Sequence, residues 1–546
     1  MHNFFTKKCY YGQFPIQYKS DFVNELGRAT MKNNPLVLTL DFGTQSVRTS
    51  LINKQGENVY LFKKAYDPIY FSDKKGYAEQ HADFYWDSLV ECLKTLAQES
   101  KNNLKDVIAM TVTTFRDSAV LLDKDNKPLR PVILWLDQRL ARADEKIPAL
   151  HRFLFKLVGM KDTIVMNRTR TMAHWVKENE PELWSKVEKY VNISTYINYK
   201  LTGELADSPG GLTGHYPLNY KKSVWYKEGA MKGRIFGVPN RMLPRVVRPG
   251  DVIGYLKDEV AELCGLPKGL KLIASGSDKG CETIGLGCLT PDIGAISYGT
   301  ACTIEVSNPK YHEPEPFLPA YAAAVPNLYN MDVQIYRGYW MLKWFASEFA
   351  SELEKEAKEK KLPVEEILDH WLNEVPVGSD GLILQPYWGP GLARPLAKGA
   401  IMGFSNIHTR KHMYRAIVEG IAFALREGLE SIEKSQKQKV KSLRISGGGS
   451  LSDEICQITA DIFGLEISRA QTIESTSLGA AIATFTAVKE FKDVHEAVKC
   501  MSKVSTTFKP NQTNHRMYDR IYHDVYLKVY PRLKPLNEEI NSIFKR

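Results

Sequence analysis

Short apolar runs that end in small polar residues recur along the chain. Residues 36–40 form such a run and lead into Asp41-Phe42-Gly43-Thr44. A second apolar run follows at 48–52. This pattern predicts a buried strand, a tight turn containing Gly and Thr, and a returning strand, which together make a β-hairpin.

The same pattern appears again in the second half of the chain. Residues 294–298 read as a strand that ends in Gly299-Thr300, and a strand-like run at 303–306 follows. Shortly before it, a strand at 271–274 runs into Gly276-Ser277-Asp278-Lys279-Gly280. A strand, a Gly-Thr turn and a returning strand thus occur twice, which predicts two related halves.

Helical spacing of apolar residues alternates with these strands. It predicts helices at 84–97, 411–430, 453–463 and 477–488, between further strands at 107–113, 120–123, 131–135 and 441–445. This mixture indicates an α/β fold. We expect the halves to meet near 285–295, with an N-terminal extension at 1–35, one domain at 36–288 and a second at 289–546.

Composition narrows the class of protein. A length of 546 residues implies at least two domains, and 43% hydrophobic with 25% charged residues is ordinary for a globular protein. The net charge of +10 comes without a basic block, so neither a nucleic-acid partner nor a membrane partner is expected. No apolar run is long enough for a transmembrane helix, and the eight scattered cysteines form no CxxC pair. A reducing cytoplasm suits such thiols.

The two Gly-Thr turns are candidate phosphate loops. Glycine lets backbone N–H groups approach phosphate oxygens, and a neighbouring hydroxyl adds a hydrogen bond. Either turn alone would more simply be a tight hairpin, but the matched pair favours phosphate binding. The residues concerned are Gly43, Thr44, Gln45 and Arg48 in the first loop, and Gly299 and Thr300 in the second.

Two further features suit a nucleotide. Asp41, at the end of the first strand, offers a carboxylate to Mg²⁺, although a turn-capping aspartate is the alternative. Gly447-Gly448-Gly449 lies between a strand and a helix. Without side chains it leaves room for a flat nucleobase and its ribose, and a plain flexible loop is the alternative.

Candidate acceptor residues lie mainly in the first half. Asp278 follows a strand and could serve as a base for a hydroxyl, although an aspartate in such a turn is usually structural. Arg116 and Asp117 pair a donor with an acceptor and could grip vicinal hydroxyls. A solvated turn is their alternative. Trp135 offers an apolar wall, unless it is simply a core residue.

Taken together, these residues resemble the FGGY family of carbohydrate kinases, within the actin/hexokinase/Hsp70 ATPase superfamily. The resemblance covers roughly 36–490. Motifs that carry it, in chain order, are Asp41 to Arg48, Gly76 to Gln80 with Trp86, Trp135 to Arg139, His174 to Pro181, Leu201 to Glu204, Gly276 to Gly280, Ser297 to Thr300, Gly399 to Glu419, Gly447 to Gly449 and Gly479 to Ala481.

The resemblance implies two RNase H-like (actin-like ATPase) domains flanking a central cleft, with ATP and Mg²⁺ as cofactors and Asp278 as the catalytic base. It also implies a small sugar or polyol as acceptor and leaves a homodimer open. Arg116-Asp117 is similar to the glycerol-kinase pair, in which Arg is followed by Glu, whereas xylulokinases carry Met-His there. The other departures are Thr303 in place of a Phe wall and His174 where the family often has Lys.

Two other interpretations remain at this point. An actin- or Hsp70-like ATPase that acts on proteins would share the phosphate loops but would not explain Arg116, Asp117 and Trp135. A sugar sensor without activity would not need both Asp41 and Asp278. The expected function is therefore transfer of the γ-phosphoryl group of ATP to a hydroxyl of a ketopentose, glycerol or a longer polyol.

Overall fold

A computed structural model describes residues 34–143, 147–157, 161–315, 318–389, 391 and 394–544. The predicted N-terminal extension therefore lies almost wholly outside the described residues. The description below concerns the part of the chain that follows it.

The first half is built on a six-stranded sheet in the order β13-β14-β5-β1-β2-β3. β1 pairs antiparallel with β2 and parallel with β5, and β14 extends the parallel part. β1 is buried along its whole length, as expected for a central strand. The bounds are β1 (Leu36–Phe42), β2 (Ser46–Ile52), β3 (Asn58–Ala65), β5 (Val107–Thr114), β13 (Val252–Tyr255) and β14 (Lys271–Ile273).

The second half is built on a seven-stranded sheet in the order β17-β18-β16-β15-β21-β22-β23. β15 pairs antiparallel with β16 and parallel with β21, and β22 extends the parallel part. The bounds are β15 (Ile293–Tyr298), β16 (Cys302–Asn308), β17 (Tyr321–Ala322), β18 (Tyr329–Ile335), β21 (Ser442–Ser446), β22 (Glu466–Ala470) and β23 (Val504–Phe508).

The two sheets share one topology. In each, a three-stranded antiparallel meander comes first. Its first strand pairs in parallel with a later strand, and that strand pairs in parallel with another. The first strand of the meander is β1 in one half and β15 in the other. The prediction of two related halves is therefore confirmed at the level of strand order.

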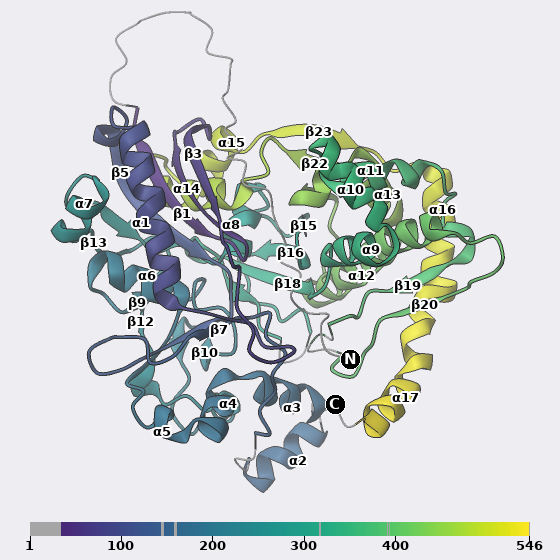
Figure 1. Cartoon of the computed structure of the whole chain (residues 1–546), viewed down its shortest axis with the longest axis horizontal. Helices are drawn as coiled ribbons and strands as arrows, with labels where there is room; N and C mark the ends of the chain where they lie inside the picture. Colours follow the sequence, from purple (N-terminus) through teal and green to yellow (C-terminus); the bar gives the residue numbers. More distant parts are fainter. Residues whose placement is uncertain are drawn as a thin grey trace, which may run out of the picture. The chain divides into compact units, whose positions relative to one another are not determined.

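Helices cover the first sheet. Figure 1 shows α1 (Ala82–Glu99) running along the sheet, and it contacts β2 and β3. A small sheet in the order β4-β7-β6-β8 adjoins these elements. Other elements of this half are β4 (Glu79–Gln80), β6 (Ala119–Leu122), β7 (Val132–Ile133), β8 (Lys189–Asn192), β9 (Ala206–Asp207), β10 (Leu218–Asn219), β11 (Val224–Trp225), β12 (Arg245–Val246), α2 (Ala149–Leu157), α3 (Lys161–Arg170), α4 (Met172–Asn179), α5 (Pro181–Trp184), α6 (Ile193–Thr202) and α7 (Asp258–Cys264).

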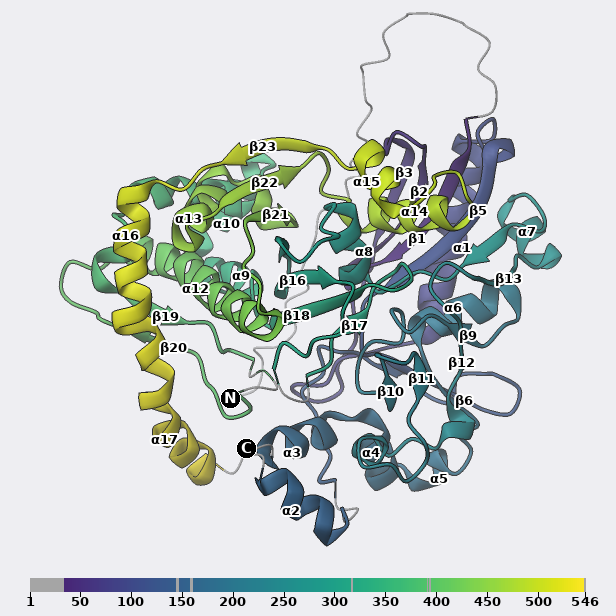
Figure 2. The same cartoon turned by 180° about the vertical axis from the view of Figure 1, so that it is seen from behind.

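In the second half, α12 is the central helix and contacts β16, β18 and α13. Figure 2 shows α12 beside α13, with α16 and α17 following one another in yellow. The bounds are α9 (Trp340–Phe349), α10 (Ser351–Lys360), α11 (Val364–Asp369), β19 (Ile383–Gln385), β20 (Ala400–Met402), α12 (Arg410–Gln436), α13 (Asp453–Phe463), α15 (Val494–Met501), α16 (Gln512–Ile521) and α17 (Leu527–Phe544).

Two helices connect the halves. α8 (Asp278–Gly285) and α14 (Ser475–Ala487) pack against each other, and α14 also contacts β1 and β5. A Cβ atom on Gly285 would lie 1.9 Å from the Ser475 carbonyl oxygen, and one on Gly479 would lie 1.8 Å from that of Cys281. Glycine is required at both positions because the two backbones touch at this crossing.

Most predicted elements are found, with shifted ends. The predicted helix at 411–430 is longer, because α12 continues to Gln436. The predicted strand at 131–135 is shorter, because β7 is only Val132–Ile133. The described cysteines are free thiols, and all but Cys500 are buried. Among the described residues, no helix combines the length and apolar character that crossing a bilayer requires.

Candidate active site

The two predicted phosphate loops come together. In the first, the Gly43 N–H donates to the Ser46 carbonyl at 2.9 Å and closes the turn between β1 and β2. The Gln45 side chain donates to the Thr300 hydroxyl at 3.5 Å, which links the first loop to the second. Residues that are far apart in the sequence thus lie together at the two turns.

Asp41 lies beneath the first loop and is buried. Burial raises the pKa of Asp41 to about 7, although the Arg48 guanidinium, 3.4 Å from its Oδ2, acts in the opposite direction. Arg48 is shared with Glu474, which it contacts at 2.8 Å. Because Asp41 is poorly compensated by cations, its environment fits a carboxylate that binds a metal ion.

Asp278 is the first residue of α8, with Ser277 as the N-cap. The Asp278 Oδ1 accepts the Lys279 N–H at 2.8 Å, and no bond to its Oδ2 is found among the described residues. The alternative interpretation, an aspartate in a turn, does not hold, because the helix begins directly at Asp278. Burial raises the pKa of Asp278, while the charges of Lys279 and Arg116 lower it.

A network of charged residues next to Asp278 was missed by the sequence reasoning. The Lys279 ammonium donates to Glu282 at 2.7 Å and also to the Ser297 hydroxyl. The other oxygen of Glu282 accepts from Ser446. Lys279 was visible only as a neighbour of Asp278, and Glu282 carried no signal, because their partners come from distant strands.

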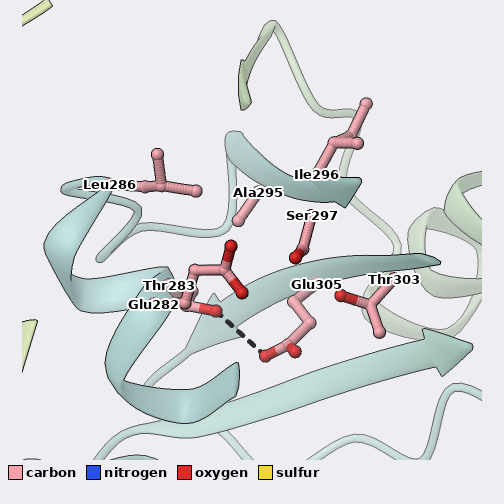
Figure 3. A pocket seen from close by; sticks show the side chains of 8 residues that line it. All are labelled: Glu282, Thr283, Leu286, Ala295, Ile296, Ser297, Thr303 and Glu305. Atoms are coloured by element: carbon pink, nitrogen blue, oxygen red, sulfur yellow. Dashed lines mark hydrogen bonds between the residues drawn. The ribbon is translucent and has the colours of Figure 1, made fainter. Parts of the chain in front are cut away.

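Beside this network lies a small cavity, shown in Figure 3. Glu305 on β16 points into it and accepts from the Thr283 hydroxyl at 2.9 Å. Its other oxygen is buried and has no partner among the described residues. Burial raises the pKa of Glu305 to about 8, and the nearby Asp332 adds to this effect.

Glu305→Gln is expected to change how stability depends on pH. Because the pKa of Glu305 is higher in the folded state, its contribution to stability is full below about pH 4.5 and is lost progressively as the pH rises through about 8. The glutamine variant should therefore gain stability relative to the parent between about pH 5 and pH 9. Urea denaturation at both pH values measures this. Glu356→Gln, on the exposed face of α10, is the control; equal pH dependence in all three proteins would contradict the prediction.

Arg116 and Asp117 have separate partners. Arg116 contacts Asp332 at 2.6 Å and Gln334 at 3.3 Å, both on β18 of the second sheet. Asp117 instead accepts from the backbone N–H and contacts the ring of His215 at 2.9 and 2.6 Å. Burial would raise the pKa of Asp117, but His215 lowers it below its usual value. The two adjacent side chains therefore bind different partners, and the segment is not a solvated turn.

Trp135 is half-buried, and its indole N–H donates to the Thr44 hydroxyl at 3.1 Å. It therefore connects the acceptor residues to the first phosphate loop. The two departures noted in the sequence are both buried: His174 contacts the Ile235 carbonyl through Nε2 at 3.0 Å, and Thr303 lies in β16. His174 is thus a packed residue with a backbone partner.

The three consecutive glycines differ from one another. Gly447 has φ 86°, and a Cβ there would lie 2.6 Å from the Tyr298 carbonyl oxygen. A Cβ on Gly449 would lie 2.3 Å from the Tyr339 ring, whereas one on Gly448 would meet nothing within 4 Å. Packing within the chain explains the outer two glycines, and only Gly448 faces open space.

Known proteins resemble this chain over most of its length. The family model for the N-terminal domain of the FGGY family of carbohydrate kinases matches residues 36–285, and the model for its C-terminal domain matches 294–488. A xylulose kinase from Lactococcus lactis is 30% identical over 493 residues, which cover 89% of this chain and 95% of that protein.

A glycerol kinase from Nitratidesulfovibrio vulgaris is 25% identical, with 89% of this chain and 96% of that protein covered. Among solved structures, a ligand-bound xylulose kinase from Lactobacillus acidophilus superimposes with a TM-score of 0.78 at 23% identity, over 93% of this chain and all of that one. This similarity confirms the predicted fold class of two actin-like ATPase domains.

Matches to carbohydrate kinases in both halves favour a kinase over a protein-directed ATPase. The chain therefore belongs to the FGGY family of carbohydrate kinases, enzymes that transfer a phosphoryl group to an alcohol.

Proposed function

We propose that this protein transfers the γ-phosphoryl group of ATP to a hydroxyl of an uncharged ketose or polyol, with Asp278 as the general base. The observation that carries the proposal is the position of Asp278. One of its oxygens is occupied by the Lys279 N–H, and the other has no partner among the described residues. The charges of Lys279 and Arg116 lower the pKa of Asp278, and the charge of Asp278 raises the pKa of Asp41. These mutual effects support a place for Asp278 near both the acceptor residues and the first phosphate loop.

ATP would bind at the paired Gly-Thr loops and at the triple glycine. Gly43, whose N–H bonds the Ser46 carbonyl, would keep the first loop tight beside the phosphates. The backbone amide at Gly299 is suited to a phosphate oxygen, and Thr44, Gln45 and Thr300 add side-chain donors. Asp41 would hold Mg²⁺, with Arg48 beside it. The described residues contain no cluster of three or more metal-ligating side chains. A single carboxylate fits Mg²⁺, because this ion commonly uses one or two carboxylates together with substrate phosphates. The metal would neutralise phosphate charge during transfer.

The proposal includes a division of labour between the halves. Residues 36–288 would contribute the acceptor residues and the first phosphate loop, and residues 289–546 would bind most of the nucleotide. The acceptor would contact Arg116, Asp117 and Trp135 in the first half. The buried free thiols support a reducing cytoplasm as the location, while the homodimer stays a prediction.

Charge balance favours an uncharged acceptor. The cation of Arg116 is compensated by Asp332, and that of Lys279 is compensated by Glu282. A sugar acid would therefore meet no free cation in this set of residues, and it would be repelled by Asp278 and Asp332. Hydroxyl groups can both donate and accept, which suits a site with mixed partners. Named relatives that act on xylulose and on glycerol support the same class of acceptor.

A screen of acceptors tests the proposed function. ADP release would be measured with D-xylulose, D-ribulose, glycerol, tetritols, pentitols and gluconate at saturating ATP. An uncharged compound from this panel is expected to give the highest kcat/KM. A preference for gluconate would refute the charge argument, and ATP hydrolysis that no sugar stimulates but a protein does would refute the kinase itself.

The nucleotide position can be tested with a matched pair of substitutions. Gly448→Ala should leave stability nearly unchanged, because its Cβ would meet no atom of the described residues within 4 Å. It should raise the KM for ATP if the adenosine occupies that space. Gly447→Ala should instead cost stability, about 1–3 kcal/mol, because of its positive φ and the Tyr298 carbonyl. Thermal denaturation and ATP titration separate the two effects. An unchanged KM for ATP in Gly448→Ala would place the nucleotide elsewhere.

A further inference from the structure

We propose that His215, held by Asp117, binds a hydroxyl of the acceptor through its Nε2 atom and so determines which acceptor is used. This inference rests on the proposed function, because it assigns a specificity-determining residue to the same acceptor site. It also changes the role of Asp117, which becomes a positioning residue.

Both oxygens of Asp117 are committed to His215. Oδ1 accepts the His215 backbone N–H at 2.9 Å, and Oδ2 lies 2.6 Å from the ring Nδ1. The Asp117 pKa is held below its usual value by this contact, so the carboxylate can only accept. Nδ1 must therefore carry the proton, and a neutral His215 ring presents Nε2 as an acceptor.

The Nε2 atom of His215 is buried, and no hydrogen bond to it is found among the described residues. Leaving a buried polar atom unpaired destabilises a protein, so such an atom calls for an explanation. A ligand hydroxyl that donates to Nε2 would supply the missing bond.

The backbone around His215 is shaped for this contact. Asp117 has φ 57°, which is uncommon for a residue other than glycine, and Gly214 has φ 139°. A Cβ on Gly214 would lie 2.5 Å from the Asp117 Oδ1. The close approach of the two segments therefore requires both an unusual conformation at Asp117 and a glycine at 214, and its result is a fixed imidazole.

The surroundings of His215 belong to the proposed acceptor site. Asp117 directly follows Arg116, and the charges of Arg116, Asp117 and Asp332 all act on the pKa of the half-buried Tyr321 and Tyr336 hydroxyls. The Asp332 Oδ1 is also buried without a partner among the described residues. The site thus offers two acceptors beside the guanidinium donors of Arg116, which matches a compound with several hydroxyl groups.

Monodeoxy analogues of the best acceptor in the panel test the inference. For the parent protein, removing the hydroxyl that His215 binds should lower kcat/KM about tenfold or more. In His215→Leu, kcat/KM for the full acceptor should fall by a similar factor while the KM for ATP stays constant. The penalty for that one deoxy analogue should disappear, and the penalties for the other analogues should remain.

The control is His174→Leu, because His174 is also buried but already has the Ile235 carbonyl as partner. It should leave the pattern of deoxy penalties as in the parent.

If His215→Leu fails to fold, Asp117→Asn serves instead. The asparagine amide can donate to Nδ1, which would convert Nε2 into a donor. The KM for the acceptor should then rise, and the KM for ATP should not change. Retention of every deoxy penalty in the His215 or Asp117 variant would overturn the inference. Turnover of sugars by the parent tests the proposed function separately.

Discussion

Asp278→Asn is expected to abolish most phosphoryl transfer while leaving ATP binding intact. A general base contributes about 10²–10⁴-fold to such a reaction, and the amide cannot accept the proton of the acceptor hydroxyl. kcat should therefore fall by about this factor. Stability should not fall, because the substitution removes a half-buried carboxylate whose ionisation is already disfavoured. Steady-state kinetics and calorimetric titration with a non-hydrolysable ATP analogue measure the two parts.

Asp258→Asn is the matched control for this substitution. Asp258 is the first residue of α7, as Asp278 is of α8, but its side chain is 70% exposed. The same chemical change at an equivalent place in a helix should leave kcat unchanged. Near-parental turnover in Asp278→Asn would remove Asp278 from the mechanism, whereas a loss of ATP affinity together with kcat would indicate a general disturbance of the site.

Arg116→Ala should both weaken acceptor binding and destabilise the protein. Arg116 and Asp332 are 13% and 4% exposed, and their contact joins the first half to β18 of the second. Removing one partner of a buried ion pair leaves the other charge unpaired and costs about 3–5 kcal/mol. The KM for the acceptor should rise more than the KM for ATP, because Arg116 donates in the acceptor site. Urea denaturation and kinetics with both substrates give the two results.

A second substitution separates the two effects of Arg116→Ala. In the double variant, Asp332→Asn removes the carboxylate charge that Arg116→Ala leaves unpaired. The double variant should therefore recover much of the lost stability. It should not recover acceptor binding, because the guanidinium donors are still missing. An acceptor KM that returns to the parental value in the double variant, or never changes in the single one, would contradict a direct role for Arg116.

The sequence pattern predicted those elements that depend only on neighbouring residues, such as tight turns and amphipathic or apolar helices. The hairpins around Gly43 and Gly299 were visible because apolar runs on either side of a Gly-Thr turn can form little else. The buried helix predicted at 477–488 corresponds to α14, since its small apolar residues suit a helix that packs on all sides. The N-terminal start of α8 was missed, because Ser277 followed by Asp278 reads equally well as a turn or as a helix cap.

Residues that depend on long-range contacts could not be predicted in this way. Asp332 and Glu305 lie in ordinary buried strands, and only the approach of the second sheet brings Asp332 to Arg116. His215 carried no signal either, because its meaning comes from Asp117, 98 residues earlier in the chain. For the three glycines the sequence suggested one common purpose, whereas the structure shows packing reasons for two of them.

The amino-acid sequence was enough to predict the repeated hairpins, the α/β class, the resemblance to carbohydrate kinases and the candidate residues Asp41, Asp278 and Arg116. These depend on periodicity, turn chemistry and short motifs, which are local properties of a chain. Which charges compensate one another, and which polar atoms remain unpaired among the described residues, became visible only in the folded structure. Burial and pairing set the cost of each charge, and both depend on which distant segments the fold brings within a few ångströms. Asp117 shows the difference: its sequence suggested a direct contact with the acceptor, and its place in the fold commits it to His215.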